Sequence, residues 1–247
     1  MNLYLQNGDF IDEIDHRPWL KPTHPWIIYQ EWNDALFMHW KVDQKILREM
    51  VPTKLELETF EDQYWVSIVV FRLEKARPRF LPHIPVISNF HEINVRTYVR
   101  MGDKRGVYFL DIEAENWISC KLANAFSGLN YRKSTIEREK NKNQIILSNS
   151  NSKRNFSMKL DYKIAEQMVL KPSIVKSLTE LYSVYVENNG KYKRFQVHHK
   201  EWDIYGIRNE KIELDYQLGS LELNSKNLAL AHYSPGVQVV AWNREYL

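Results

Sequence analysis

The sequence predicts a mainly β protein built around one large, curved, antiparallel sheet with a few short helices. Short runs rich in β-branched and aromatic residues recur along the chain, and Gly, Pro, Asn and Asp turn signals separate them. Hydrophobic residues make up 44% of the chain, enough for a large core. No shift of composition marks a linker among the 247 residues, so we expect one domain over residues 1–247.

Residues 1–15 are expected to form a flexible segment. They carry four acidic residues and lack the basic start and apolar core of a signal peptide. No apolar stretch is long enough to span a bilayer, and the single cysteine, Cys120, excludes an intramolecular disulfide. These features predict a cytoplasmic protein without a membrane partner, in which Cys120 is a small buried hydrophobe instead of a nucleophile.

Two early strands, a short helix and a hairpin are expected in the first third of the chain. Asp43 should cap the helix, and Pro52 should end it. The early strands cover residues 26–32 and 36–40, and the hairpin joins residues 55–60 to residues 64–73.

A long antiparallel pair and a helix are expected in the middle of the chain. After a proline-rich loop over residues 77–89, residues 90–101 form a strand, and a turn at 102–106 returns it through residues 107–112. Asn116 is a plausible N-cap for the helix, and Gly128 supplies its left-handed stop.

The second half of the chain is expected to consist of strands. Asn188-Asn189-Gly190 predicts a hairpin turn, because Asn and Gly tolerate a positive φ. The expected strands are residues 129–137, 144–147, 156–164, 182–187, 191–197, 206–214 and 229–240.

Segments spread along the chain resemble the bacterial family called domain of unknown function 2071 (DUF2071), which includes the YqjF-like proteins. They occur in the family's order from about His16 to Trp242. The segments are His16-Arg17-Pro18-Trp19, Phe37-Met38-His39-Trp40, Val42-Asp43, Glu92-Ile93-Asn94-Val95-Arg96-Thr97-Tyr98-Val99, Gly106-Val107-Tyr108-Phe109, Val197-His198-His199 and His232-Tyr233-Ser234-Pro235-Gly236-Val237.

The resemblance implies an acetoacetate decarboxylase-like fold, a cone-shaped half-barrel whose interior forms a pocket. In the decarboxylases that interior holds a pair of lysines, one of which forms a Schiff base. Tyr131 and Arg132 occupy the corresponding positions here, so the resemblance does not imply the decarboxylase activity. Lys133 lies on the strand face of Tyr131 and remains an alternative nucleophile, against the simpler interpretation of an exposed lysine.

The strand over residues 92–100 carries the main candidate site. Glu92, Asn94, Arg96, Tyr98 and Arg100 share one face, and apolar residues and a threonine share the other. The polar face either meets water or lines the interior of the half-barrel. Glu92 and Arg96 lie about 13 Å apart along the strand, so inside a barrel each needs another partner or a ligand.

Two histidines complete the candidate binding residues, with Tyr131 and Arg132. His39 and His232 are either ligand donors or hydrogen-bonded structural histidines. His198 and His199 are adjacent in a strand and point to opposite faces, and no spacing predicts a metal site. No fingerprint of a phosphate or dinucleotide cofactor is present, so no cofactor is expected.

These residues favour a protein that binds a small polar molecule bearing a carboxylate or a carbonyl group. One alternative is a carbonyl-directed enzyme, similar to a decarboxylase or lyase, that uses Lys133 or Glu92. Another is a structural or interaction protein without a ligand. The net charge of +3, with acids and bases interspersed, argues against a nucleic-acid partner, although the hairpin at residues 191–195 mixes basic and aromatic residues. Self-association into a homo-oligomer is left open.

Overall fold

In the part of the chain that the structure describes, fifteen strands join in a single sheet. The structure is a computed structural model that describes residues 8–116, 118, 120–121, 128–129, 131–151 and 155–247. The strands are β1 Ile28–Val42, β2 Glu56–Leu57, β3 Tyr64–Pro78, β4 Phe90–Met101, β5 Lys104–Ala114, β6 Tyr131–Lys133, β7 Thr135–Asn141, β8 Gln144–Asn151, β9 Phe156–Gln167, β10 Ser183–Asn188, β11 Lys191–His198, β12 Tyr205–Leu218, β13 Leu221–Asn224, β14 Leu230–Ala241 and β15 Glu245–Tyr246. The helices include α1 Gly8–Asp12, α2 Gln44–Met50, α3 Pro85–Ser88 and α5 Ser173–Thr179.

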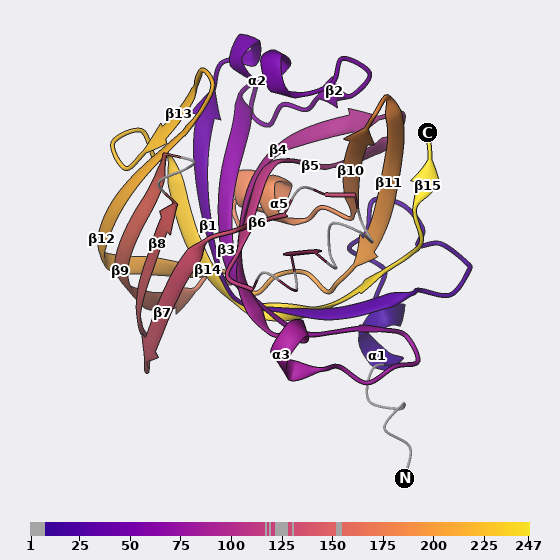
Figure 1. Cartoon of the computed structure of the whole chain (residues 1–247), viewed down its shortest axis with the longest axis horizontal. Helices are drawn as coiled ribbons and strands as arrows, with labels where there is room; N and C mark the ends of the chain where they lie inside the picture. Colours follow the sequence, from indigo (N-terminus) through magenta and orange to yellow (C-terminus); the bar gives the residue numbers. More distant parts are fainter. Residues whose placement is uncertain (1–7, 117, 119, 122–127, 130, 152–154) are drawn as a thin grey trace.

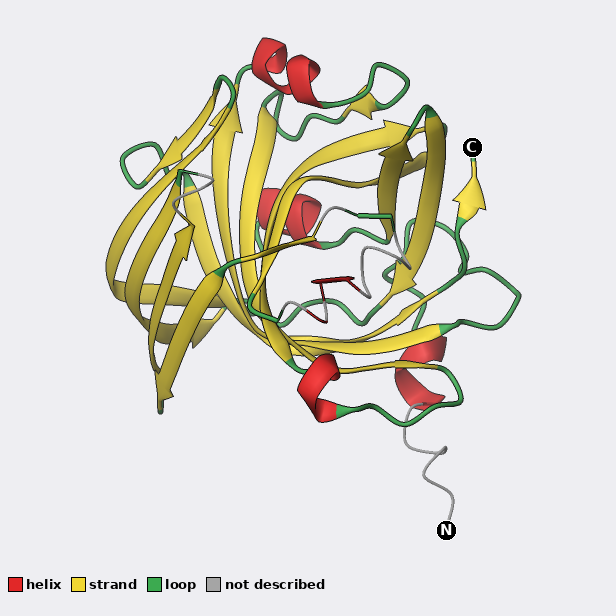
Figure 2. Ribbon diagram, viewed as in Figure 1, coloured by secondary structure: helices red, strands yellow, loops and turns green. Residues whose placement is uncertain are grey.

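The main path of the sheet runs β15-β11-β10-β5-β4-β3-β1-β14-β12-β9-β8-β7. Neighbours along it pair antiparallel except that β10 lies parallel to β5, and β6 adds a second parallel pairing to β5. The predicted class, a mainly β fold around a large and chiefly antiparallel curved sheet, is therefore confirmed. Figure 2 shows how few residues lie in helices.

The sheet curls into two compartments that share its central strands (Figure 1). An additional pairing of β11 with β14, at Val197 and His198, closes a ring. We call this ring of β1, β3, β4, β5, β10, β11 and β14 the closed barrel, and α5 packs inside it. The strands beyond β14, namely β12, β9, β8 and β7, curve back over the opposite face of β1 and β3 and form what we call the open half.

The shared strands are covered on both faces. Along β4, every residue from Glu92 to Val99 is buried, because alternate side chains point into the closed barrel and into the open half. A polar strand face that meets water, one of the two alternatives from the sequence, is thereby excluded for these residues.

Two expected connections turned out differently. The two early strands are one strand, β1, in which Asp34 takes a positive φ of 52° and the register with β3 shifts between Asn33 and Leu36. The turn-forming residues thus make a bulge instead of a break. The expected hairpin pairs only Phe60 with Gln63, and β2 joins β4 instead.

Other local signals were confirmed. Strand β4 has the predicted bounds, and Asp43 caps α2 by accepting a hydrogen bond from the Lys45 amide at 2.7 Å. Asn189 and Gly190 have positive φ between β10 and β11. Asn116 caps its helix through the Ile118 amide at 3.0 Å, and residues 122–127 of that prediction lie outside the described residues.

The N-terminal segment packs on the barrel through Phe10 of α1. Phe10 in α1 is buried and contacts the cluster of Tyr29, Val240 and Trp242. Residues 1–7 lie outside the described part, so the expected flexibility of residues 1–15 stays a prediction. None of the helices in the described part of the chain has the length and hydropathy of a membrane-spanning segment.

Candidate functional site

A row of polar residues crosses three strands inside the closed barrel. His39 on β1 lies opposite Ser67 on β3, and Ser67 lies opposite Arg96 on β4. Neighbouring strands are about 4.8 Å apart, so the three side chains stand side by side on one surface. His39 and Ser67 are fully buried, and Arg96 is 8% exposed.

Arg96 is a buried cation without an acidic partner among the described residues. Its Nη2 donates to the Leu178 carbonyl of α5 at 3.3 Å, and its guanidinium carbon lies 5.7 Å from the centre of the Phe37 ring. Its Nε has no hydrogen-bond partner in the described structure. Burial lowers the pKa of Arg96 from its ordinary value, but a guanidinium keeps its proton at neutral pH.

Hydrogen bonds link Arg96's neighbours into a chain. Tyr98 donates to the Leu178 carbonyl at 3.1 Å, because a carbonyl can only accept. The Tyr98 oxygen therefore accepts from Ser67 at 2.5 Å, and Ser67 accepts from His39 Nδ1 at 2.5 Å. His39 Nε2 is then an acceptor for His232 Nε2 at 3.4 Å. This order assigns one proton to each imidazole.

His39 and His232, the two histidines in this row of hydrogen bonds, are neutral at pH 7. Burial, His232 and Arg96 hold the pKa of His39 well below its ordinary value. Burial and then Arg96 lower the pKa of His232 to about 3. At neutral pH, Arg96 is therefore the one charged group among Arg96, His39, Ser67, Tyr98 and His232.

A second polar group lies further along β4. Glu92 is 3% exposed, and the Asn94 amide nitrogen lies 3.5 Å from one of its oxygens, a weak contact. The other oxygen, Oε2, and Asn94 Oδ1 have no partner among the described residues. Tyr131 on β6 bonds to Glu92 and lies in the row of Asn94 and Ile112.

The environment of Glu92 favours its protonated form. Burial raises its pKa to about 7, against the opposing effects of Asn94 and Tyr131. Burial also raises the pKa of Tyr131, as do the charge and hydrogen bond of Glu92. A carboxyl group that titrates near neutral pH can give or take a proton, which suits general acid–base chemistry.

Two predicted residues lie apart from this surface. Arg132 points to the opposite face from Tyr131, as adjacent strand residues must, and its Nε pairs with Asp111 at 3.3 Å. Lys133 shares the face of Tyr131 but is exposed. It therefore lacks the desolvation that would activate a Schiff-base lysine.

The buried residues that sequence reasoning did not select are Ser67, Phe37 and the Leu178 carbonyl. Ser67 is the one polar residue in the apolar run of residues 65–71, and that interruption is a signal that could have identified it. Leu178 comes from α5, an element that the sequence patterns did not predict. Cys120 is buried, and burial raises the pKa of its thiol to about 11, as expected for a structural cysteine.

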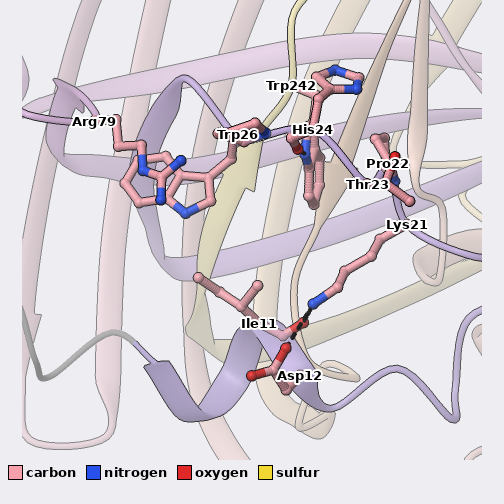
Figure 3. Close-up of a pocket in the computed structure, with 10 residues that line it drawn as sticks. Ile11, Asp12, Lys21, Pro22, Thr23, His24, Trp26, Arg79 and Trp242 are labelled. Atoms are coloured by element: carbon pink, nitrogen blue, oxygen red, sulfur yellow. Dashed lines mark hydrogen bonds and ion pairs between the residues drawn. The ribbon is translucent and has the colours of Figure 1, made fainter.

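A surface hollow lies elsewhere, where the N-terminal segment meets the barrel (Figure 3). It has a volume of about 370 Å³, and its wall includes Trp26, Trp242 and Arg79, with Lys21 bound to Asp12 at its edge. None of the predicted site residues lines it. The polar surface in the closed barrel and this hollow are separate features.

The chain matches known proteins along most of its length. Residues 29–238 match the family DUF2071, described as an uncharacterized conserved protein (COG2071). The uncharacterized protein YqjF of Bacillus subtilis (strain 168) is 36% identical over 228 residues, which cover 90% of this chain and 93% of that protein.

Solved structures share the fold at low identity. An acetoacetate decarboxylase from Legionella pneumophila superimposes with a TM-score of 0.63 at 10% identity, covering 96% of this chain and 94% of that one. The enduracididine biosynthesis enzyme MppR complexed with pyruvate gives a TM-score of 0.61 at 8% identity, with 92% and 91% coverage. These similarities confirm the acetoacetate decarboxylase-like fold that the resemblance implied, and at this identity they show the fold alone.

Proposed function

The chain belongs to the DUF2071 family of uncharacterized conserved proteins, and for this member we propose that the closed barrel binds a small molecule bearing a carboxylate or a carbonyl group. One observation carries the proposal. Arg96 is a buried guanidinium that faces the barrel interior without an acidic partner among the described residues.

Burial of an unpaired charge costs several kcal/mol, about as much as a small domain can spare. An anionic ligand would offset that cost, because the forked donors of a guanidinium match both oxygens of a carboxylate. Arg96 still has a free donor at Nε, and the neutral His39 and His232 add polar surface without competing for an anion.

Two features favour 2-oxo acids within this class. Asn94 lies between Arg96 and Glu92 on the same strand face, so its amide can bond the carbonyl oxygen next to a carboxylate that Arg96 holds, with Glu92 beyond it. MppR, which shares the fold, was solved as a complex with pyruvate and with a condensation product of pyruvate.

A thermal-shift screen of carboxylates and 2-oxo acids on the wild type and on Arg96→Met tests the proposal. We expect one or more acids to raise the melting temperature of the wild type. In Arg96→Met, the affinity should fall by roughly 30-fold to several thousand-fold, because a charge-assisted contact in a desolvated site contributes about 2 to 5 kcal/mol.

Arg100→Met is the matched control. Arg100 lies on the same face of β4 but is exposed and pairs with Glu56 at 2.9 Å, so its loss should leave the affinity unchanged. Equal binding by the wild type and Arg96→Met would overturn the assignment. A wild type that no acid stabilises would favour a structural or interaction protein without a ligand.

A second candidate function is proton transfer next to a carbonyl group, with Glu92 as the base. It is favoured by the pKa of about 7 and by the unpartnered Oε2 of Glu92. In such a step the carboxylate takes a proton from the carbon beside the carbonyl and later returns one, so no other reactant is consumed.

Exchange of the pyruvate methyl protons in D₂O, followed by NMR, tests this activity. The wild type should accelerate the exchange, and Glu92→Gln should not, while Arg100→Met should exchange at the wild-type rate. Borohydride added with pyruvate should leave the protein mass unchanged, because Lys133 is exposed. A stable mass increase at Lys133 would instead support a Schiff-base enzyme.

A further inference from the structure

We propose that the open half holds a second site, for a small carboxylate anion, formed by Arg138 on β7 and Tyr162 on β9. This site is independent of the function proposed for the closed barrel, since it lies on the other side of the shared strands (Figure 1).

Strand register places the two residues on the inner face of the open half. Lys140 lies opposite Ile145 of β8, and Ile145 lies opposite Tyr162 of β9. Arg138 is two residues from Lys140 and therefore points to the same side. Ile145 is fully buried, and Tyr162 is 1% exposed within the apolar cluster of the open half.

Both residues present buried donors that have no partner among the described residues. All three guanidinium nitrogens of Arg138 are shielded from solvent without a hydrogen bond, and so is the hydroxyl of Tyr162. The charge of Arg138 acts on the Tyr162 hydroxyl and lowers its pKa, although burial raises that pKa by more. The strand register and this electrostatic effect both place Arg138 near Tyr162, and neither group has an acceptor among the described residues.

The charged side chains near Arg138 form an ion pair with each other. Lys140 pairs with Asp34 at 2.5 Å, and Tyr233 donates to the same Asp34 oxygen. Asp34 lies in the bulge of β1, where it has a positive φ, and its carboxylate points toward Lys140 of β7, the last strand of the open half. Arg138 also acts on Asp34 and helps to lower the pKa of that carboxyl, so the charges of Arg138, Lys140 and Asp34 together leave one net positive charge in the open half.

This charge and geometry fit a monoanionic carboxylate. A guanidinium donates to both carboxylate oxygens, and the Tyr162 hydroxyl supplies a further donor. A doubly charged anion would leave one charge unbalanced beside Asp34. The neighbours Ile136, Ile145 and Leu147 are apolar, so a short hydrocarbon group on the acid would contact them.

Titration with trifluoroacetate, followed by ¹⁹F NMR relaxation, tests the site. The Arg96→Met protein is used as the background, so that the closed barrel does not contribute and failure of the first proposal has no effect on this result. We expect saturable binding in that background. Adding Arg138→Met should weaken it at least about tenfold, and adding Tyr162→Phe should weaken it about threefold to tenfold.

Arg208→Met is the charge-matched control. Arg208 is exposed on β12 and pairs with Glu166, so its loss removes one positive charge without touching the site. Binding should survive that substitution. Absence of saturable binding in the Arg96→Met background, or equal weakening by Arg138→Met and Arg208→Met, would overturn the proposal.

Discussion

The two faces of the same central strands differ in chemistry. Toward the open half, the buried side chains of β1, β3 and β4 are apolar except for Thr97: Leu36, Met38, Trp40, Val66, Ile68, Val70, Ile93 and Val95. Toward the closed barrel they present a mixture in which buried polar groups are prominent: His39, Ser67, Glu92, Asn94, Arg96 and Tyr98. A strand covered on both faces is typically apolar throughout.

We infer from this difference that the apolar face stabilises the fold and that the polar face serves function. The apolar face buries side chains that each stabilise the fold by about 1.5 to 3 kcal/mol. The polar face does the opposite, because Arg96 and the unpartnered atoms of Glu92 and Asn94 have lost water without full compensation. A fold keeps such groups where they act on a ligand, which is why we place the site there.

The largest expected effect is on the free energy of unfolding, in a comparison of one residue on β3 with one on the adjacent strand β4. Ile68 is fully buried on the apolar face, and Ile68→Ala should lower the free energy of unfolding by about 2 to 5 kcal/mol, because it leaves a cavity. Arg96→Met should leave that free energy unchanged or raise it by up to about 2 kcal/mol. Urea unfolding measured by tryptophan fluorescence gives both values. Similar losses in the two variants would erase the distinction between the faces.

A smaller effect is expected from pH. The pKa of Glu92 is about 7 in the folded protein and 4.5 ordinarily, so the folded state holds this proton more tightly than the unfolded state. Its contribution to stability is complete below pH 4.5 and is lost as the pH rises to about 7. Glu92→Gln should therefore be more stable than the wild type by about 3 kcal/mol at pH 8, with a difference near zero at pH 4.

The measurement is the difference between urea-unfolding profiles of the two proteins from pH 4 to pH 8. A difference is needed because the buried histidines act in the opposite direction: the lowered pKa of His232, about 3, makes stability fall with acid. A difference between the profiles that stays constant with pH would show that Glu92 titrates normally.

The sequence predicted local structure well where one signal dominated. Residues 90–101 became β4 with the predicted bounds, because their alternation is regular and a glycine turn follows. Asn33 and Asp34 lie in the gap expected between the two early strands, and Asp34 does take a positive φ, but it forms a bulge within β1 instead of a turn. A sequence pattern alone cannot distinguish these outcomes.

The candidate site was predicted only in part, for a physical reason. Alternation shows that Glu92, Asn94, Arg96 and Tyr98 share a face, but it does not show what covers that face. The cover comes from β10, β11 and α5, which lie about 80 to 100 residues later in the chain. Arg132 was assigned with Tyr131 through the resemblance, yet neighbouring residues of a strand cannot both point inward.

The smallest expected effect concerns Ser67, which joins the polar face into one network. Ser67→Ala removes the acceptor of His39 Nδ1 and one donor to Tyr98, while Tyr98 keeps the Leu178 carbonyl. An unsatisfied buried donor costs about 1 to 3 kcal/mol, so we expect a loss of that size in the free energy of unfolding. Ser183→Ala is the matched control, because Ser183 is equally buried and its hydroxyl has no partner in the described structure. The free energy of unfolding of that control should not fall. If the two variants lose the same amount, the hydrogen bonds of Ser67 do not stabilise the polar face, and the fixed protonation of His39 and His232 that we infer from them loses its basis.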